Sequence, residues 1–226
     1  EEVETASRKG VPVIASVFGF DAEEFAESAV MGEKGGAIAV ELNVSCPHVR
    51  EVGVEIGQRP RVVAEVTHAV KSRVHVPVFV KLSPNVTDIA EVAKAAERAG
   101  ADGITAINTV LGTAVDVDSG FPILGGVLGG LSGPAIHPIA LRAVYQIRQA
   151  VHIPIIGVGG IEDWKSAVQM IMAGASAVQV GSAITSKGLD VFREVTTGIG
   201  KFLEQKGYRS IREVVSLAAA HKVEGS

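Results

Sequence analysis

The chain of 226 residues is 47% hydrophobic and 20% charged, with a formal net charge of −4, a balance typical of globular proteins large enough to bury a sizeable core. The acidic net charge and an aromatic content of only 4% argue against a nucleic-acid-binding surface, and the lack of an apolar run of about 18 residues argues against a membrane span. The single cysteine excludes an intrachain disulfide, so we expect a reducing compartment, the cytoplasm.

Apolar runs of strand length alternate along the chain with amphipathic stretches of helix length. In chain order we predict strand 11–18, helix 22–32, strand 38–44, helix 59–72, strand 76–82, helix 87–99, strand 103–108, helix 138–151, strand 153–158, helix 163–173, strand 177–181, helix 189–206 and helix 210–220. Residues 110–134 are rich in glycine and are predicted to be irregular, with Asp116 and Asp118 as turn residues of a solvated hairpin.

The alternation of strands and helices predicts an α/β fold. Strands that are apolar throughout are typical of parallel sheets covered on both faces. A doubly wound open sheet is one such arrangement, but a (β/α)8 TIM barrel gathers the polar and glycine-rich strand ends into one ring. We therefore predict a single domain over residues 1–226 with six of the eight barrel units present. We expect the first two strands, about 60 residues, to be missing on the N-terminal side.

Two reactive side chains lie at or just beyond the ends of predicted strands. Cys46 comes just after a strand, and Pro47 stiffens the turn. A lone cysteine is more often a small buried packing residue, but one at a loop mouth can act as a general base. Lys81 ends the apolar run 78–80 and is expensive to bury without a partner. It either extends to solvent or supplies a fixed positive charge to a site.

Two asparagines, Asn43 and Asn108, lie at comparable ends of different predicted strands. Each side chain offers both a donor and an acceptor, which suits a cyclic imide or amide, although asparagine is also a common turn residue. His48 has no second histidine or carboxylate at metal-ligand spacing, so we predict no metal site.

Glycines follow the last two predicted strands, in the pairs Gly159–Gly160 and Gly181–Ser182. Bare backbone N–H groups near helix N-termini bind phosphate well. The loops after the last two strands are also the recurrent phosphate site of (β/α)8 barrels. These pairs therefore predict a phosphorylated ligand but do not identify it.

Taken together and in order, the motifs resemble those of class 1 dihydroorotate dehydrogenases. The residues that carry the resemblance are E-L-N-V-S-C-P at 41–47, V-K-L-S-P-N-V-T-D-I at 80–89, I-N-T at 107–109, G-G-L-S-G-P-A-I at 129–136 and G-V-G-G-I at 157–161. The segments 83–88 and 131–136 are most similar to the NAD-linked subclass, class 1B.

The resemblance implies an FMN-bound barrel that oxidises (S)-dihydroorotate to orotate in pyrimidine biosynthesis. It implies that Cys46 removes the C5 proton while a hydride passes from C6 to FMN. It assigns the pyrimidine to Asn43, Asn108 and Thr109, and FMN to Ser16, Asn43, Lys81, Ile107, Gly133, Gly159, Gly160, Gly181 and Ser182. Electrons would pass to NAD+ through a partner subunit that carries FAD and a 2Fe–2S cluster, with a homodimer inside a heterotetramer.

Three alternatives stay open. His48 stands where the family commonly has asparagine, and S-C-P-H at 45–48 is similar to the related domain of dihydropyrimidine dehydrogenases, which reduce uracil and thymine. A non-catalytic barrel remnant is the second. A phosphate-sugar barrel without flavin is the third, although it would not need Cys46 and Lys81 at these positions.

Overall fold

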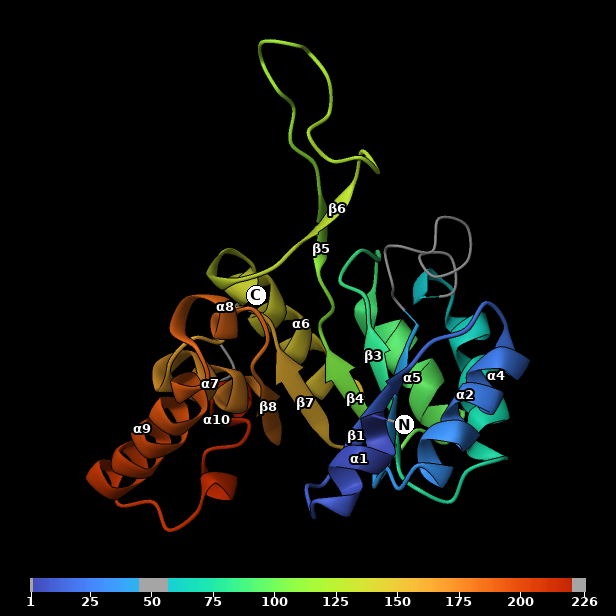
Figure 1. Ribbon diagram of the computed structural model, residues 1–226. Helices are drawn as coiled ribbons and strands as arrows, with labels where there is room; N and C mark the ends of the chain where they lie inside the picture. The colour runs from blue at the N-terminus through green and yellow to red at the C-terminus, as the bar shows by residue number, and fades with distance from the viewer. Residues whose placement is uncertain (1, 45–56, 221–226) are drawn as a thin grey trace.

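The computed structural model describes residues 2–44 and 57–220, and it arranges them as a curved sheet with helices around it (Figure 1). In chain order the elements are α1 Glu2–Arg8, β1 Ile14–Val17, α2 Ala22–Lys34, β2 Ala39–Asn43, α4 Pro60–Lys71, β3 Val78–Leu82, α5 Ile89–Arg98, β4 Gly103–Ala106, β5 Val110–Gly112, β6 Gly129–Leu131, α6 His137–Arg148, β7 Ile155–Val158, α7 Trp164–Ala173, β8 Ala177–Gln179, α8 Ala183–Lys187, α9 Asp190–Lys206 and α10 Leu217–Ala220. Two short 3-10 turns lie at Pro134–Ile136 and Ile211–Glu213.

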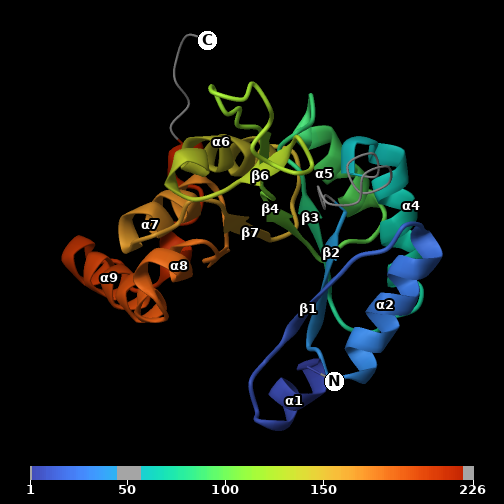
Figure 2. The same cartoon turned by 45° about the horizontal axis from the view of Figure 1, so that its top comes forward.

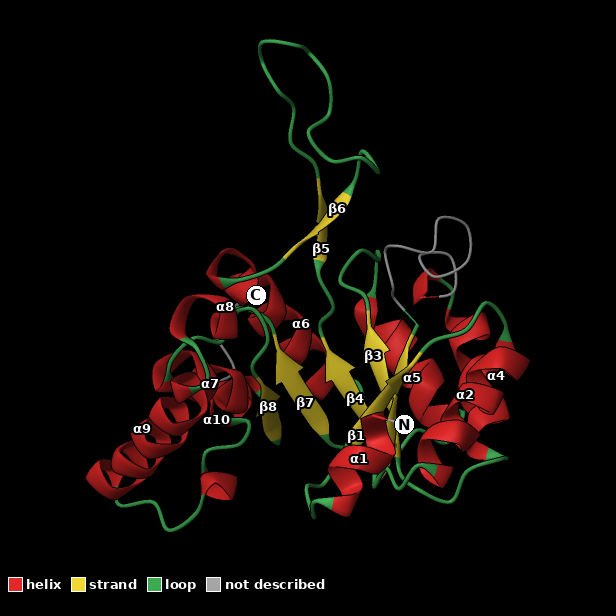
Figure 3. Cartoon of the chain, in the orientation of Figure 1, coloured by secondary structure: helices red, strands yellow, loops and turns green. Residues whose placement is uncertain are grey.

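The main sheet has six strands in the order β1-β2-β3-β4-β7-β8, and each neighbouring pair is parallel. Each helix contacts the next along the outside, from α2 through α4, α5 and α6 to α7, and Figure 3 shows the strands on their inner side. A doubly wound sheet would carry helices on both faces. The prediction of a (β/α)8 barrel with six units present is therefore confirmed.

The sheet ends at β1 on one side and at β8 on the other, and these two strands do not pair with each other in the described part of the chain. Figure 2 shows the resulting open side of the barrel between β1 and α8. Ile14 of β1 is 41% exposed and Phe18 just beyond it is 56% exposed. The face of β1 that looks toward the barrel interior is therefore only partly covered.

Strand β3 illustrates how the barrel wall is built. Val78, Val80 and Leu82 are buried in the core that the strands share with the helices. Successive strand side chains point to opposite faces, so Phe79 and Lys81 face the barrel interior. Gly103, the register partner of Phe79 on β4, has no room for a side chain, because a Cβ there would lie 2.7 Å from the Phe79 ring.

Aspartates begin three of the helices on the outside of the sheet. Asp21, Asp88 and Asp163 each accept backbone N–H groups from the first turn of α2, α5 and α7, which satisfies donors that have no partner within the helix. Burial acts to raise the pKa of Asp163, but hydrogen bonds from Ser166 and the charge of Lys187 together hold that pKa below its ordinary value.

The predicted strands and the predicted helices up to residue 206 are all present in the structure. The predicted helix 210–220 is wrong, because a 3-10 turn that starts at Ser210 is followed by the separate short helix α10. Ser216, between them, has a φ of 66° and donates its N–H to Ile171 O at 3.1 Å. That positive φ does not fit a continuous right-handed helix. Helices α1 and α8 were not predicted.

Residues 110–131, which we call the arm, form a long antiparallel hairpin that projects from the body (Figure 1). At its far end Val115 pairs with Pro122, and Ser119 N donates to Asp116 Oδ1 at 2.7 Å. Hydrogen bonds from the Ser119 backbone and hydroxyl lower the pKa of Asp116. The prediction of a solvated hairpin is confirmed, and β5 and β6 replace part of the predicted irregular stretch. Exposed apolar side chains of the arm are Val115, Val117, Phe121, Ile123, Leu124, Val127, Leu128 and Leu131.

Candidate active site

A cavity of about 330 Å³ opens at the carboxyl ends of β3, β4, β7 and β8, the end that carries the active site in (β/α)8 barrels. Its size is within the range of small-molecule sites. Most of the predicted site residues line it, namely Lys81, Ile107, Asn108, Thr109, Gly133, Gly159, Gly160, Gly181 and Ser182. The structure therefore brings together side chains that are up to 101 residues apart in sequence (182 minus 81).

A polar cluster lies in the barrel interior at one side of this cavity. Lys81 Nζ is 3.5 Å from Glu41 Oε1, and Gln179 Nε2 donates to Glu41 Oε2 at 3.0 Å. Lys81 and Gln179 line the cavity, whereas Glu41 is only 4% exposed. Thr105, the register partner of Lys81 on β4, has a buried hydroxyl without a hydrogen-bond partner. The cluster therefore supplies a positive charge and an amide to the cavity wall.

The two asparagines predicted to hold a ring are in direct contact. Asn108 Nδ2 donates to Asn43 Oδ1 at 3.2 Å, and Thr109 N donates to Asn108 Oδ1 at 2.8 Å. These bonds fix the orientation of the Asn108 amide. The adjacent Thr109 is held from outside the cavity as well, because Asn85 Nδ2 donates to Thr109 O at 3.2 Å.

Glycine is required at the opposite end of the cavity. Gly160 has a φ of 65°, and a Cβ there would lie 2.8 Å from both Gly133 O and His137 Cβ. Gly159 has a φ of 136°, and its Cβ would lie 2.6 Å from the Ala140 Cβ. Left-handed backbone and close approach of this kind are typical of loops whose N–H groups cradle an anion. The carbonyl of Gly159 is also contacted by His137 Nδ1 at 2.9 Å.

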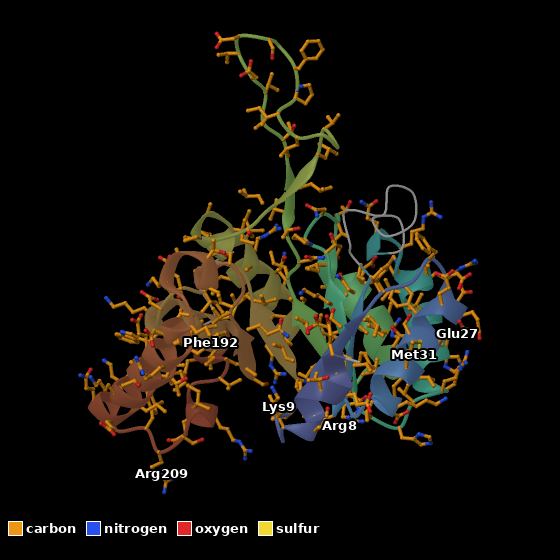
Figure 4. The ribbon with its side chains drawn as sticks, in the orientation of Figure 1. Arg8, Lys9, Glu27, Met31, Phe192 and Arg209 are labelled. Atoms are coloured by element: carbon orange, nitrogen blue, oxygen red, sulfur yellow. The ribbon has the colours of Figure 1, made fainter. Side chains whose placement is uncertain are left out.

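Ser16 does not join the cavity. It lies on β1 and borders a separate hollow together with Glu27 and Met31 of α2. Figure 4 shows Glu27 and Met31 on the far side of the molecule from Phe192 of α9. Cys46, the predicted base, and His48 lie outside the residues that the structure describes, so their predicted roles are not tested by it.

Three polar residues of the site were missed by sequence reasoning, namely Glu41, Ser132 and Gln179. Glu41 and Gln179 are polar residues inside otherwise apolar strands, and this signal is visible in the sequence. A buried polar residue on a strand implies a partner on the same face. Which partner that would be depends on the curvature that brings β2 and β8 across from one another.

Within residues 2–44 and 57–220 no group of three or more His, Cys, Asp or Glu side chains is placed to hold a metal ion. None of the helices in those same ranges has the length and apolar character needed to cross a bilayer.

Comparison with known proteins identifies the family. A model of the dihydroorotate dehydrogenase family matches residues 1–203. The chain is 51% identical over 209 residues to the dihydroorotate dehydrogenase B (NAD(+)) catalytic subunit of Pyrococcus abyssi. The aligned region covers 92% of this chain and 69% of that protein. It is 50% identical over 219 residues to the subunit of the same name from Methanosarcina acetivorans, covering 96% of this chain and 70% of the relative.

A solved structure shares the fold. The dihydroorotate dehydrogenase of Eimeria tenella in complex with ferulenol superposes with a TM-score of 0.76 at 23% identity, over 88% of this chain and 58% of that one. The chain thus spans less than two thirds of that structure and about 70% of the curated relatives. On the sequence matches, the chain belongs to the dihydroorotate dehydrogenase family of oxidoreductases.

Proposed function

We propose that the protein containing this chain oxidises (S)-dihydroorotate to orotate with FMN as the hydride acceptor, as a step of pyrimidine biosynthesis. The observation that carries the proposal is that Lys81, Asn108 and the Gly159–Gly160 pair line one cavity in a member of this family. A cation, an amide and an anion cradle are the groups that a flavin phosphate and a pyrimidine ring require together.

The residues that line the cavity are of the kinds that binding of FMN would require. The backbone at Gly159 and Gly160 lies too close to its neighbours to leave room for any Cβ, and with Gly133, Gly181 and Ser182 it would hold the phosphate end. Lys81 would face the pyrimidine edge of the flavin, and Ile107 would lie beside its ring. FMN, when bound, supplies the acceptor for the hydride that leaves C6 of the substrate.

The substrate ring would be held by Asn43, Asn108 and Thr109. The Asn108–Asn43 bond leaves the Asn108 amide oriented for a ring that alternates N–H and C=O groups. Cys46 follows Asn43 by three residues (46 minus 43), and we assign it the role of general base that takes the C5 proton.

Electron transfer beyond FMN is proposed to use a second subunit. The curated relatives are named as NAD(+)-linked catalytic subunits, a name that supports passage of electrons to NAD+ through a partner with FAD and a 2Fe–2S cluster. We propose a homodimer within a heterotetramer, in the cytoplasm. The apolar side chains exposed along the arm support association with another chain.

A full-length protein reconstituted with FMN tests the proposal. We expect flavin absorbance, oxidation of dihydroorotate, and a large loss of that activity in Cys46→Ser with flavin still bound. A protein that remains colourless in saturating FMN would refute the proposal and favour a phosphate-sugar barrel or a non-catalytic remnant. His48 favours one second candidate, a pyrimidine reductase. Reduction of uracil with NAD(P)H and no oxidation of dihydroorotate would identify that activity.

A further inference from the structure

Glu41 carries a carboxylate that is buried inside the barrel wall. It lies in the middle of β2, between Val40 and Leu42, which are fully buried, and it is itself only 4% exposed. Glutamate is almost never buried unless it is paired, because removing its charge from water is expensive. Its burial therefore needs an explanation in the groups around it.

Both carboxylate oxygens of Glu41 are engaged, and by residues of different strands. Oε1 lies 3.5 Å from Lys81 Nζ of β3, while Oε2 accepts a hydrogen bond of 3.0 Å from Gln179 Nε2 of β8. Gln179 is 138 residues away in sequence, at the other end of the sheet. One oxygen is thus anchored across the barrel, and the other is directed at the cation that lines the cavity.

We propose that Glu41 is a positioning residue: anchored by Gln179, it orients the Lys81 ammonium in the cavity and offsets part of its charge. This inference rests on the proposed function, because the consequence concerns FMN. A cation beside the flavin stabilises the negative charge of the reduced ring. A buried counter-ion next to that cation weakens this stabilisation, since charges interact strongly in the protein interior. Glu41 therefore holds the potential of the bound flavin lower than Lys81 alone would set it.

A purely structural role makes a different prediction. If Glu41 served only to link β2 to β8 across the interior, replacing it would change stability and leave the flavin potential alone. Buried ion pairs are often replaceable by apolar residues without loss of stability, so burial by itself does not argue for a structural role. The flavin potential is the measurement that separates the two roles.

The test uses the full-length, FMN-loaded protein and the variant Glu41→Gln. Glutamine keeps the size of the side chain and a carbonyl that accepts from Gln179, and it removes only the charge. Glu65→Gln is the matched control, because Glu65 lies on an exposed position of α4. We expect the midpoint potential of the flavin in Glu41→Gln to become more positive by the equivalent of a tenfold change in equilibrium, about 30 mV for a two-electron couple. The midpoint potential of the flavin in Glu65→Gln should equal that of wild type.

A second measurement covers the case in which Glu41→Gln does not retain FMN. Lys81→Met removes the cation beside the buried Glu41 carboxylate, so the ligand-free variant should unfold at lower urea concentration than wild type. The double variant Lys81→Met/Glu41→Gln should recover part of that loss. Equal unfolding midpoints for the single Lys81→Met and double variants would overturn the pairing.

The outcomes are distinct from failure of the proposed function. Wild-type protein that binds no FMN refutes the function itself. Wild type and Glu41→Gln that both bind FMN with the same midpoint potential, or a variant potential below that of wild type, overturn the role assigned to Glu41 and leave the function standing.

Discussion

The replacement Gly160→Ala tests the glycine end of the cavity most directly. At a φ of 65°, an alanine adopts a left-handed conformation that costs roughly 1–2 kcal/mol. Its Cβ would also lie 2.8 Å from Gly133 O, a backbone atom that no rotamer change can move aside. Overpacking of this kind adds about 1–3 kcal/mol, so we expect the free energy of unfolding to fall by about 3 kcal/mol in total.

Gly207→Ala is the matched control for that variant. Gly207, the residue after α9, is also left-handed, with a φ of 74°, but nothing lies within 4 Å of its Cβ position. It should therefore lose only the conformational part, about 1–2 kcal/mol. Urea unfolding of both ligand-free variants measures the difference, provided that the m-value is unchanged. FMN affinity, followed by flavin fluorescence, should fall at least tenfold in Gly160→Ala only. Equal losses of stability and affinity in the two variants would contradict the close approach inferred at Gly160.

Two further predictions concern a helix cap and the substrate. Asp163→Ala removes the N-cap of α7 and should lower the unfolding free energy by about 1 kcal/mol at neutral pH. Because the pKa of Asp163 lies below its ordinary value of 3.8 in the folded protein, the stabilisation is present above that value and lost as pH falls through the folded pKa. The unfolding free energies of wild type and Asp163→Ala should thus converge under acid conditions. A difference that stays constant down to pH 2 would argue against the cap. Asn108→Ala removes the donor to Asn43 Oδ1 and should weaken orotate binding roughly tenfold, a loss of about 1.4 kcal/mol, measurable by flavin spectral titration. Unchanged orotate affinity would exclude Asn108 from the substrate site.

The barrel was predictable because its signals are local. Each strand of the main sheet is an apolar run, and the helices that cover it have an apolar face and in part an identifiable start, such as Asp88 at α5. Parallel pairing then places all carboxyl ends on one rim. Lys81, Asn108 and Gly160 could therefore be assigned to one site although they are far apart in sequence.

The remaining features depend on tertiary contacts that local patterns do not encode. The hydrogen bond between Gln179 and Glu41 spans the barrel and exists only because the sheet curves. The interruption of the last predicted helix is set by Ser216, whose N–H bonds to Ile171 at the end of α7. Ser16 was assigned to the FMN site by resemblance alone; it borders a hollow beside α2 and does not line the cavity, and its role stays a prediction.

The root of the arm has a mechanical consequence. Asn85, in the loop after β3, accepts from Leu111 N at 2.9 Å and donates to Thr109 O at 3.2 Å. β6 packs against Thr109, since a Cβ at Gly130 would clash with the Thr109 side chain. The base of the arm is therefore held at Thr109, a residue that lines the cavity. Suppose that a second chain bound to the arm favours one position of Thr109, and that the cavity ligand favours the same position. The ligand must then strengthen binding of the second chain by the same free energy by which that chain strengthens binding of the ligand.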